Sequence, residues 1–369
     1  MNAFAHQIGQ RIRLARDEKD ITQEAFAKAL GWNSHQTVSA VETGLRQLQP
    51  EELTRISKVL DQPLAFFIDP YVVTEKRAFS YRAKANSADL AAFEKKAHKL
   101  ISANRRFREL LGEPALTFGN RLRNVGPQST LETARRCGEE TAKALELGEA
   151  PALKLREAVE ARLNVMVLFV DAPASISGAA CHLSDGDFIM VNRREVSFRR
   201  NYDLGHELFH ILTWDTMPPE KNDTILAEAE KPKPEKLADA FTAGLLMPIE
   251  AVRARWQRRA PTAPLRQWIV QNARELHVSG QALYWRLVNA GLLGRAEAEA
   301  IDRDSLSRSD GPEPGGKPNL YSAEFVRRLH SVLEQGRVTA RKAAELLECE
   351  LDDLAALFAA YGHSTPFTL

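Results

Sequence analysis

The chain has 369 residues, of which 44% are hydrophobic and 27% are charged, and its formal net charge is +1. At roughly 100–200 residues per domain this length predicts several domains, and the composition is typical of globular proteins that bury a core. The near-neutral charge excludes a global cationic field, so any nucleic-acid binding has to come from a local surface.

Cysteine usage and hydropathy exclude two further classes of protein. Cys137, Cys181 and Cys349 are odd in number, far apart and outside any CxxC pair, which argues against a disulfide framework and a thiolate zinc site. The N-terminus carries no apolar signal core, and the apolar run Val165–Val170 is far shorter than the ~20 residues of a membrane span. We therefore expect a soluble, cytoplasmic protein with no membrane association.

The first 70 residues have the pattern of a compact set of five short helices. Apolar residues recur at helical spacing from Ile8, a second helix follows the capping candidate Thr22, and Gly31 ends it. A third helix begins near Ser34 and ends before Gly44. Two further short helices are expected at residues 51–60 and 64–68.

The pattern changes twice after this domain. Residues 71–160 are polar and helical in pattern, which predicts a helical connecting region. Val165–Val170 is then β-branched and aromatic, and residues 179–183 and 188–192 flank Ser184-Asp185-Gly186-Asp187, a sequence typical of a hairpin turn. Helical pattern returns from about Asp203.

The C-terminal part consists of a linker-like segment and a helical domain. Residues 304–319 have linker composition, and helical periodicity follows them. We predict an α+β fold that is mostly α. Its expected parts are a helix-turn-helix domain (1–70), a helical connecting region (71–160), a domain with a small β-sheet (161–303), a linker (304–319) and a C-terminal helical domain (320–369).

The most specific motif is His206-Glu207-Leu208-Phe209-His210, which matches HExxH. Two histidines four residues apart lie on one face of a helix and can direct ring nitrogens at a single ion. The adjacent glutamate lies about 100° around the helix axis, where it can reach the attacking water without binding the ion. Apolar residues occupy the opposite face of the helix, as expected for a helix whose back is buried in the core.

A catalytic zinc site needs a third protein ligand. Thr213 and Thr216 stand where the longer HExxHxxGxxH pattern requires glycine and histidine, which removes that alternative. A carboxylate from a second helix remains, and residues 235–241 offer Glu235 and Asp239. Because these two lie one turn apart, helix geometry alone does not choose between them.

These motifs, with Leu245-Leu246-Met247-Pro248, resemble the ImmA/IrrE family of metallopeptidases. The resemblance implies a zincin-like peptidase domain in which His206, His210 and Glu235 bind Zn²⁺ and Asp239 does not. It also implies gluzincin-like peptide hydrolysis, with Glu207 as the catalytic base. Phe209 and Thr242 depart from the usual glycine and alanine.

The sequence leaves two features of the peptidase site open. An oxyanion-stabilising group is expected, and the candidates are Tyr202, His182 and Arg199. The strand at residues 188–192 is either an ordinary strand of the sheet or, by analogy with other zincins, an edge for an extended substrate.

Residues 23–44 resemble the Xre/Cro class of helix-turn-helix domains, with Ala27, Gly31 and Glu42-x-Gly44 at the expected places. The second helix of such a unit places short polar side chains in the major groove. Charges in residues 1–90 nearly balance, so a homodimer is expected for useful affinity for operator DNA. The residues expected to face bases are Asn33, Ser34, His35, Gln36 and Thr37, and those nearer phosphates are Gln23, Ser39 and Arg46.

The resemblance extends to Phe79-Ser80-Tyr81-Arg82-Ala83 and to the C-terminal helical tail, which are similar to segments of proteins that fuse Xre domains to ImmA/IrrE peptidases. It implies a regulatory zinc endopeptidase that cleaves a helix-turn-helix repressor, an antitoxin-type partner or itself, in stress-response or toxin–antitoxin circuits. The alternative is a DNA-binding regulator or antitoxin whose peptidase-like domain is a structural or sensing body.

Overall fold

The computed structural model describes residues 3–69, 71, 79–83, 87–114, 122, 124–183, 186–218, 231–307 and 317–368. The chain divides into two compact units, Met1–Lys76 with Lys95–Phe107, and Arg77–Glu94 with Arg108–Leu369. None of the described helices combines the length and apolar character needed to cross a lipid bilayer. The turn residues Ser184 and Asp185, and most of the expected linker at 304–319, lie outside the described residues.

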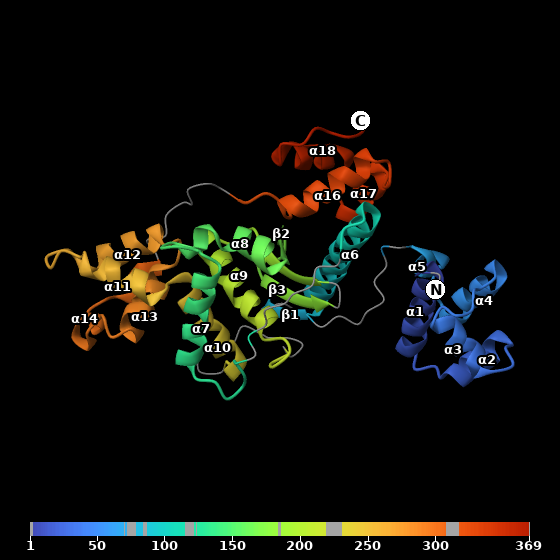
Figure 1. Cartoon of the computed structure of the whole chain (residues 1–369), viewed down its shortest axis with the longest axis horizontal. Coiled ribbons are helices and arrows are strands. Elements are labelled where there is room, and N and C mark those ends of the chain that lie inside the picture. Colours follow the sequence, from blue (N-terminus) through green and yellow to red (C-terminus); the bar gives the residue numbers. More distant parts are fainter. Residues whose placement is uncertain are drawn as a thin grey trace. The chain divides into compact units, whose positions relative to one another are not determined.

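The N-terminal part of the first unit contains five short helices, as predicted (Figure 1). They are α1 (Ala3–Glu18), α2 (Gln23–Leu30), α3 (His35–Glu42), α4 (Pro50–Leu60) and α5 (Leu64–Ile68).

Local sequence signals set the boundaries of α2 and α3. The Thr22 hydroxyl accepts a hydrogen bond from the backbone N–H of Ala25 at 3.2 Å, and the Ser34 hydroxyl accepts one from Gln36 at 3.0 Å. Both residues therefore act as N-caps. Gly31 ends α2 with φ of 72°, in the left-handed region that favours glycine.

A small apolar core with a buried ion pair beside it holds these helices together. The core includes Phe26 and Val38, both fully buried. Arg16 on α1 donates from Nε to Glu42 Oε1 on α3 at 2.6 Å. Gln23 on α2 donates from Nε2 to the other oxygen of the same carboxylate at 2.7 Å. One carboxylate thus connects three helices.

Replacing Glu42 by alanine is expected to destabilise this domain by about 3–5 kcal/mol, because the buried Arg16 guanidinium loses its partner. The measurement is calorimetric unfolding of the full chain. Glu18→Ala, at an exposed position on α1, is the matched control. The double variant Arg16→Met/Glu42→Leu should recover most of the loss, and an unchanged unfolding temperature for Glu42→Ala would contradict the assignment.

The second unit contains a four-stranded sheet in the order β1-β3-β4-β2. Its strands are β1 (Phe79–Ala83), β2 (Val165–Val170), β3 (Ile176–Leu183) and β4 (Gly186–Asn192). β3 and β4 form the predicted antiparallel hairpin, β2 runs parallel to β4, and β1 runs antiparallel to β3.

The sheet differs from the sequence prediction in three places. β3 begins at Ile176 instead of residue 179. Its first residues include the small Ser177 and Gly178, and this end of the strand pairs with the neighbouring strands although its sequence is not typical of a strand. β1 lies in the region expected to be helical, because pairing with β3 overrides the local polar pattern. β4 begins at Gly186 instead of residue 188, and because it lies between β3 and β2, residues 188–192 form an ordinary sheet strand with both sides paired, one of the two interpretations left open.

Helices of the same unit lie against this sheet (Figure 1). α9 (Ser197–Leu212) packs against β3 and β4, α8 (Leu155–Leu163) packs against β2, and α10 (Lys233–Leu246) packs against both α7 (Leu131–Ala144) and α9. The helices that follow β1 are α6 (Ser87–Leu111), α7 (Leu131–Ala144), the 3₁₀ turn η1 (Pro151–Leu153), α8 (Leu155–Leu163), α9 (Ser197–Leu212), α10 (Lys233–Leu246), α11 (Ile249–Gln257), α12 (Leu265–Glu275), α13 (Gly280–Asn289), α14 (Arg295–Glu299), α15 (Arg303–Ser307), α16 (Ala323–Glu334), α17 (Ala340–Leu347) and α18 (Leu351–Ala360).

The segment before the C-terminal helices adds a contact to the sheet. The backbone N–H of Tyr321 donates to the carbonyl of Phe169 on β2 at 2.7 Å, in an isolated antiparallel bridge. This bridge lies on the side of β2 that β4 does not occupy, so the outer side of β2 is partly covered.

Candidate metal centre

The HExxH motif lies on α9, in the core of the second unit. The apolar side chains of Leu204 and Leu208 are buried, as the helical periodicity predicted. His206, Glu207 and His210 are also buried, with exposed fractions of 2%, 0% and 2%. Buried polar side chains need partners, so the surroundings of these three define what the site can do.

Close packing of α10 against α9 brings a carboxylate to the two histidines. A Cβ atom added to Gly205 would lie 2.9 Å from Cγ2 of Thr242, so only glycine allows this approach of the two helices. Phe209, which stands where the ImmA/IrrE family usually has glycine, also contributes to the packing of α10 against α9. Its buried ring lies 5.4 Å from the ring of Phe241 on α10.

Similar close contacts fix α10 against α7. A Cβ at Gly138 would lie 2.1 Å from the carbonyl oxygen of Phe241, and one at Gly244 would lie 2.0 Å from that of Arg135. These glycine contacts were not predicted from the sequence, although Gly138 and Gly244 within helical patterns were the signal that could have indicated them. They place the first turn of α10, and with it Glu235, relative to the rest of the unit.

Glu235 contacts both histidines of the motif. Its Oε2 lies 3.0 Å from His206 Nε2, and its Oε1 lies 3.1 Å from His210 Nε2. Burial alone would raise the pKa of the Glu235 carboxyl, but hydrogen bonds with the two imidazoles outweigh it and hold the pKa far below its ordinary value. Burial lowers the pKa of His210. These shifts favour a carboxylate beside a neutral His210, the protonation states in which both side chains bind metal ions.

The cluster has the donor set and spacing of a metal site. One ligand atom from each of His206, His210 and Glu235 lies within 4.8 Å of the other two. Two imidazole nitrogens and one carboxylate are the three protein ligands of many catalytic zinc sites.

Asp239 lies on the other side of His206. Its Oδ1 is 3.1 Å from His206 Nδ1 and accepts a hydrogen bond from the Tyr202 hydroxyl at 2.6 Å, and its Oδ2 pairs with Lys231. Although burial acts to raise it, the pKa of Asp239 is lowered, chiefly by its interactions with His206. A carboxylate at the second ring nitrogen orients an imidazole and directs Nε2 toward a metal.

Glu207 lies next to β3 of the sheet. A Cβ atom added to Gly178 would lie 3.4 Å from Glu207 Cγ and 3.6 Å from its Oε1. The fully buried carboxylate therefore lies against the backbone of β3 at a residue without a side chain.

The three oxyanion candidates have different surroundings. Tyr202 donates its hydroxyl to Asp239 and so belongs to the hydrogen-bond network of His206. Arg199 Nε lies 3.5 Å from Asp203 Oδ2 in an ion pair one helical turn away. His182, on β3, pairs with the buried Asp187 at 2.5 Å, and its ring lies 5.7 Å from that of Trp214.

The residues predicted to contact DNA lie on or near α2 and α3. Asn33, His35 and Gln36 are exposed. Gln23 donates to Glu42, and Arg46 pairs with Glu52 at 2.7 Å and lies over the Trp32 ring. The half-buried members of the predicted set are Ser34, which caps α3, Thr37, Ser39, Gln23 and Arg46.

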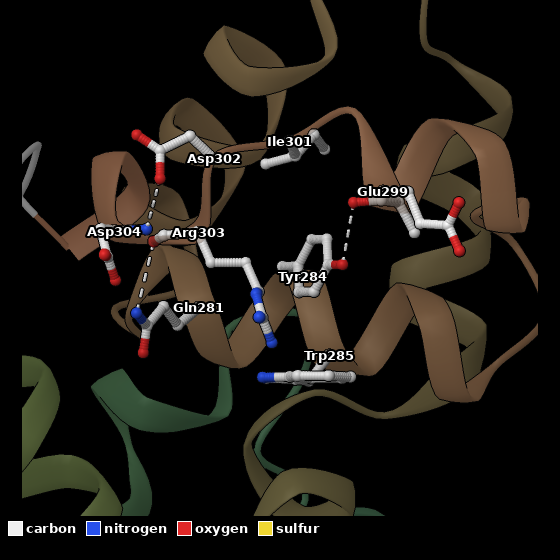
Figure 2. Close-up of a pocket in the computed structure, with 9 residues that line it drawn as sticks. Gln281, Tyr284, Trp285, Glu299, Ile301, Asp302, Arg303 and Asp304 are labelled. Atoms are coloured by element: carbon white, nitrogen blue, oxygen red, sulfur yellow. Dashed lines mark hydrogen bonds between the residues drawn. The ribbon is translucent and has the colours of Figure 1, made fainter.

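A separate pocket of about 660 Å³ lies beside α13 and its C-terminal neighbours. Figure 2 shows Trp285 next to Arg303, whose guanidinium carbon is 5.7 Å from the ring centre. Gln281 donates to the carbonyl of Arg303, and the Tyr284 hydroxyl donates to that of Ala298. These hydrogen bonds hold α14 and α15 against α13. The polar side chains of Gln281 and Tyr284 in the wall of the pocket therefore have a structural role.

Comparison with known families agrees with this division. Residues 12–67 match the family model described as Helix-turn-helix, and residues 160–288 match that of the IrrE N-terminal-like domain. No curated protein matches the chain with significant similarity.

The fold, with its candidate metal centre, is thus that of a helix-turn-helix domain joined to a metallopeptidase-like domain. The chain is a fusion of an Xre-like helix-turn-helix domain with a peptidase domain of the ImmA/IrrE type.

Proposed function

We propose that the chain is a zinc-dependent regulatory endopeptidase held at DNA by its N-terminal domain. The observation that supports this most strongly is the convergence of Glu235 on the Nε2 atoms of His206 and His210, with Glu207 on the next position of the same helix. A structural zinc site would not need a buried glutamate beside its ligands, whereas peptide hydrolysis needs a base there.

The proposed chemistry assigns one task to each side chain. His206, His210 and Glu235 would hold Zn²⁺, which when bound polarises the scissile carbonyl and makes water more acidic. Glu207 accepts a proton from the attacking water and passes it to the nitrogen of the leaving amine. Asp239 fixes the ring orientation of His206. We keep Tyr202, His182 and Arg199 as candidates for the oxyanion-stabilising group.

The substrate proposal rests on the resemblance to repressor-cleaving peptidases. We infer a protein substrate of the helix-turn-helix repressor or antitoxin type, or this chain itself, in stress-response or toxin–antitoxin circuits. We further propose that the protein acts in the cytoplasm and binds operator DNA as a homodimer. It is tested by metal analysis of the purified chain and by cleavage of a proteome-derived peptide library with and without a chelator. Zinc with no cleavage of library, co-encoded repressor or the chain itself would favour a non-catalytic regulator.

Replacing Gln36 by alanine is expected to weaken operator binding roughly 5- to 150-fold, the range for loss of a good base contact. Gln36 is exposed at the start of α3, so folding should be unaffected. The measurement is a gel shift at several salt concentrations, with the exposed Glu24→Ala on α2 as the control. Equal weakening on all DNA sequences would contradict a base contact and indicate a phosphate contact.

Replacing Asp239 by alanine is expected to weaken zinc binding about 10- to 100-fold, because His206 loses the carboxylate that orients it. A competition titration against a chromophoric chelator measures this. The exposed Asp302→Ala is the control. Unchanged zinc affinity would show that Asp239 serves packing alone.

A further inference from the structure

The outer edge of β3 is occupied by a strand from far away in the sequence. β1 pairs antiparallel with β3, with Phe79 opposite Cys181, Ser80 opposite Ala180 and Arg82 opposite Gly178. The pairing becomes irregular between Arg82 and Ala83. β1 lies outside residues 160–288, the part of the chain that matches the peptidase family model. The matched part of the chain therefore contributes β2, β3 and β4, and β1 joins them from a preceding segment.

β1 lies close to Glu207, the proposed catalytic base. Gly178 is the residue of β3 that lies against the Glu207 side chain, since a Cβ atom there would be in van der Waals contact with it. Arg82 is paired with Gly178, so β1 is the strand next to β3 on the side away from β4, at the level of Glu207. The site helix α9 also contacts β1.

We propose that the outer edge of β3 is the surface on which an extended peptide substrate pairs, and that β1 is an intramolecular occupant that must leave first. This inference rests on the proposed peptidase function. Extended peptides bind sheet edges through the backbone N–H and C=O groups of the edge strand. β3 has only one such edge, because β4 pairs with its other side. β1 and a substrate therefore compete for the same backbone groups next to Glu207.

The competition favours β1 in the resting chain. A tethered segment is present at an effective concentration on the order of millimolar, so a separate peptide must bind well or β1 must be weakened. β1 has five residues and an irregular end at the position opposite the site, so few backbone hydrogen bonds hold it. Each contributes about 1 kcal/mol, so loss of one or two should raise access to the edge roughly tenfold.

A disulfide that links β1 to β3 tests this competition and needs only one substitution. Phe79→Cys places a thiol opposite the native Cys181, and directly opposite residues in antiparallel strands have Cα atoms about 4.5–5.5 Å apart, within disulfide range. Tyr81→Cys, opposite Ala179, is the matched control because it has no opposing thiol. Both are made in the full chain carrying Glu207→Gln, so that bound peptide is not cut. The probe is a fluorescent synthetic peptide with the sequence of residues 77–86.

Anisotropy of the probe, followed as the chain is titrated to high concentration, should show weak binding to reduced Phe79→Cys, limited by competition from tethered β1, and loss of that binding on oxidation, reversed by reductant. Probe binding to the Tyr81→Cys control should change neither on oxidation nor on reduction. Equal binding to the oxidised and reduced forms, with the disulfide verified by thiol counting, would overturn the proposal. Because the assay needs no hydrolysis, its outcome is independent of whether the chain proves to be a peptidase.

A proline pair provides a second test that does not depend on disulfide geometry. Successive N–H groups of an edge strand point alternately toward its partner and away from it, and proline is tolerated only where the N–H points away. One of Ser80→Pro and Tyr81→Pro should therefore increase probe binding roughly tenfold, and the other should resemble the parent chain. Equal effects of the two, or no effect of either, would contradict release of β1.

Discussion

Replacing Glu207 by glutamine is expected to reduce peptide cleavage by a factor of about 10²–10⁴ while bound zinc stays in place. Glutamine has nearly the same shape but cannot accept a proton from water. The Glu207 carboxylate lies fully buried against Gly178 of β3, so an isosteric side chain should fit without moving the strand. The measurement is cleavage of the peptide library, with zinc content determined on the same sample.

The control for this variant is an isosteric change at an exposed glutamate outside the cluster, Glu250→Gln at the start of α11. It should leave both zinc content and cleavage unchanged. Full activity in Glu207→Gln would remove the proposed base. Loss of zinc together with activity would make Glu207 a metal-site residue and leave its role in proton transfer without support.

Replacing Glu235 by alanine is expected to remove most of the bound zinc, and with it all cleavage. Only two imidazoles would remain, whereas catalytic zinc sites use three protein ligands. The loss of affinity should exceed the roughly 10- to 100-fold change expected for Asp239→Ala, because Asp239 acts through His206. Metal analysis after dialysis measures the first effect, and a chelator competition measures the second.

The comparison of these two variants decides between the carboxylates that helix geometry left open. Asp239 contacts Nδ1 of His206, so it is not positioned to replace Glu235 at the two Nε2 atoms. Zinc retained in Glu235→Ala but lost in Asp239→Ala would reverse the assignment. Glu250→Gln serves again as the control for a change of charge near α10.

The helix-turn-helix domain was predictable because its signals are local. Thr22 and Ser34 cap the helices that follow them, and Gly31 supplies the left-handed residue that ends α2. Each of these signals acts over a few residues, so the chain around it determines the outcome. The buried Arg16–Glu42 pair was not predicted, since it joins residues on helices whose crossing the sequence does not define.

The sheet was predictable only in part, for a related reason. The hairpin of β3 and β4 follows from adjacent segments and a turn sequence between them. β1 pairs with a strand about a hundred residues further along, and nothing in its five residues identifies that partner. Its pairing gives β3 a neighbour on each side, just as β3 and β2 together enclose β4.

By itself, the sequence determined the ligand types and their helical face: His206 and His210 lie four residues apart, so any helix places them together. It also limited the third ligand to Glu235 or Asp239. Helix geometry left these two open and the family resemblance favoured Glu235; what only the tertiary structure shows is where each carboxylate lies, because the packing of Gly205 against Thr242 helps to set how α10 lies on α9. That packing places Glu235 at both Nε2 atoms and Asp239 at the far nitrogen of one ring.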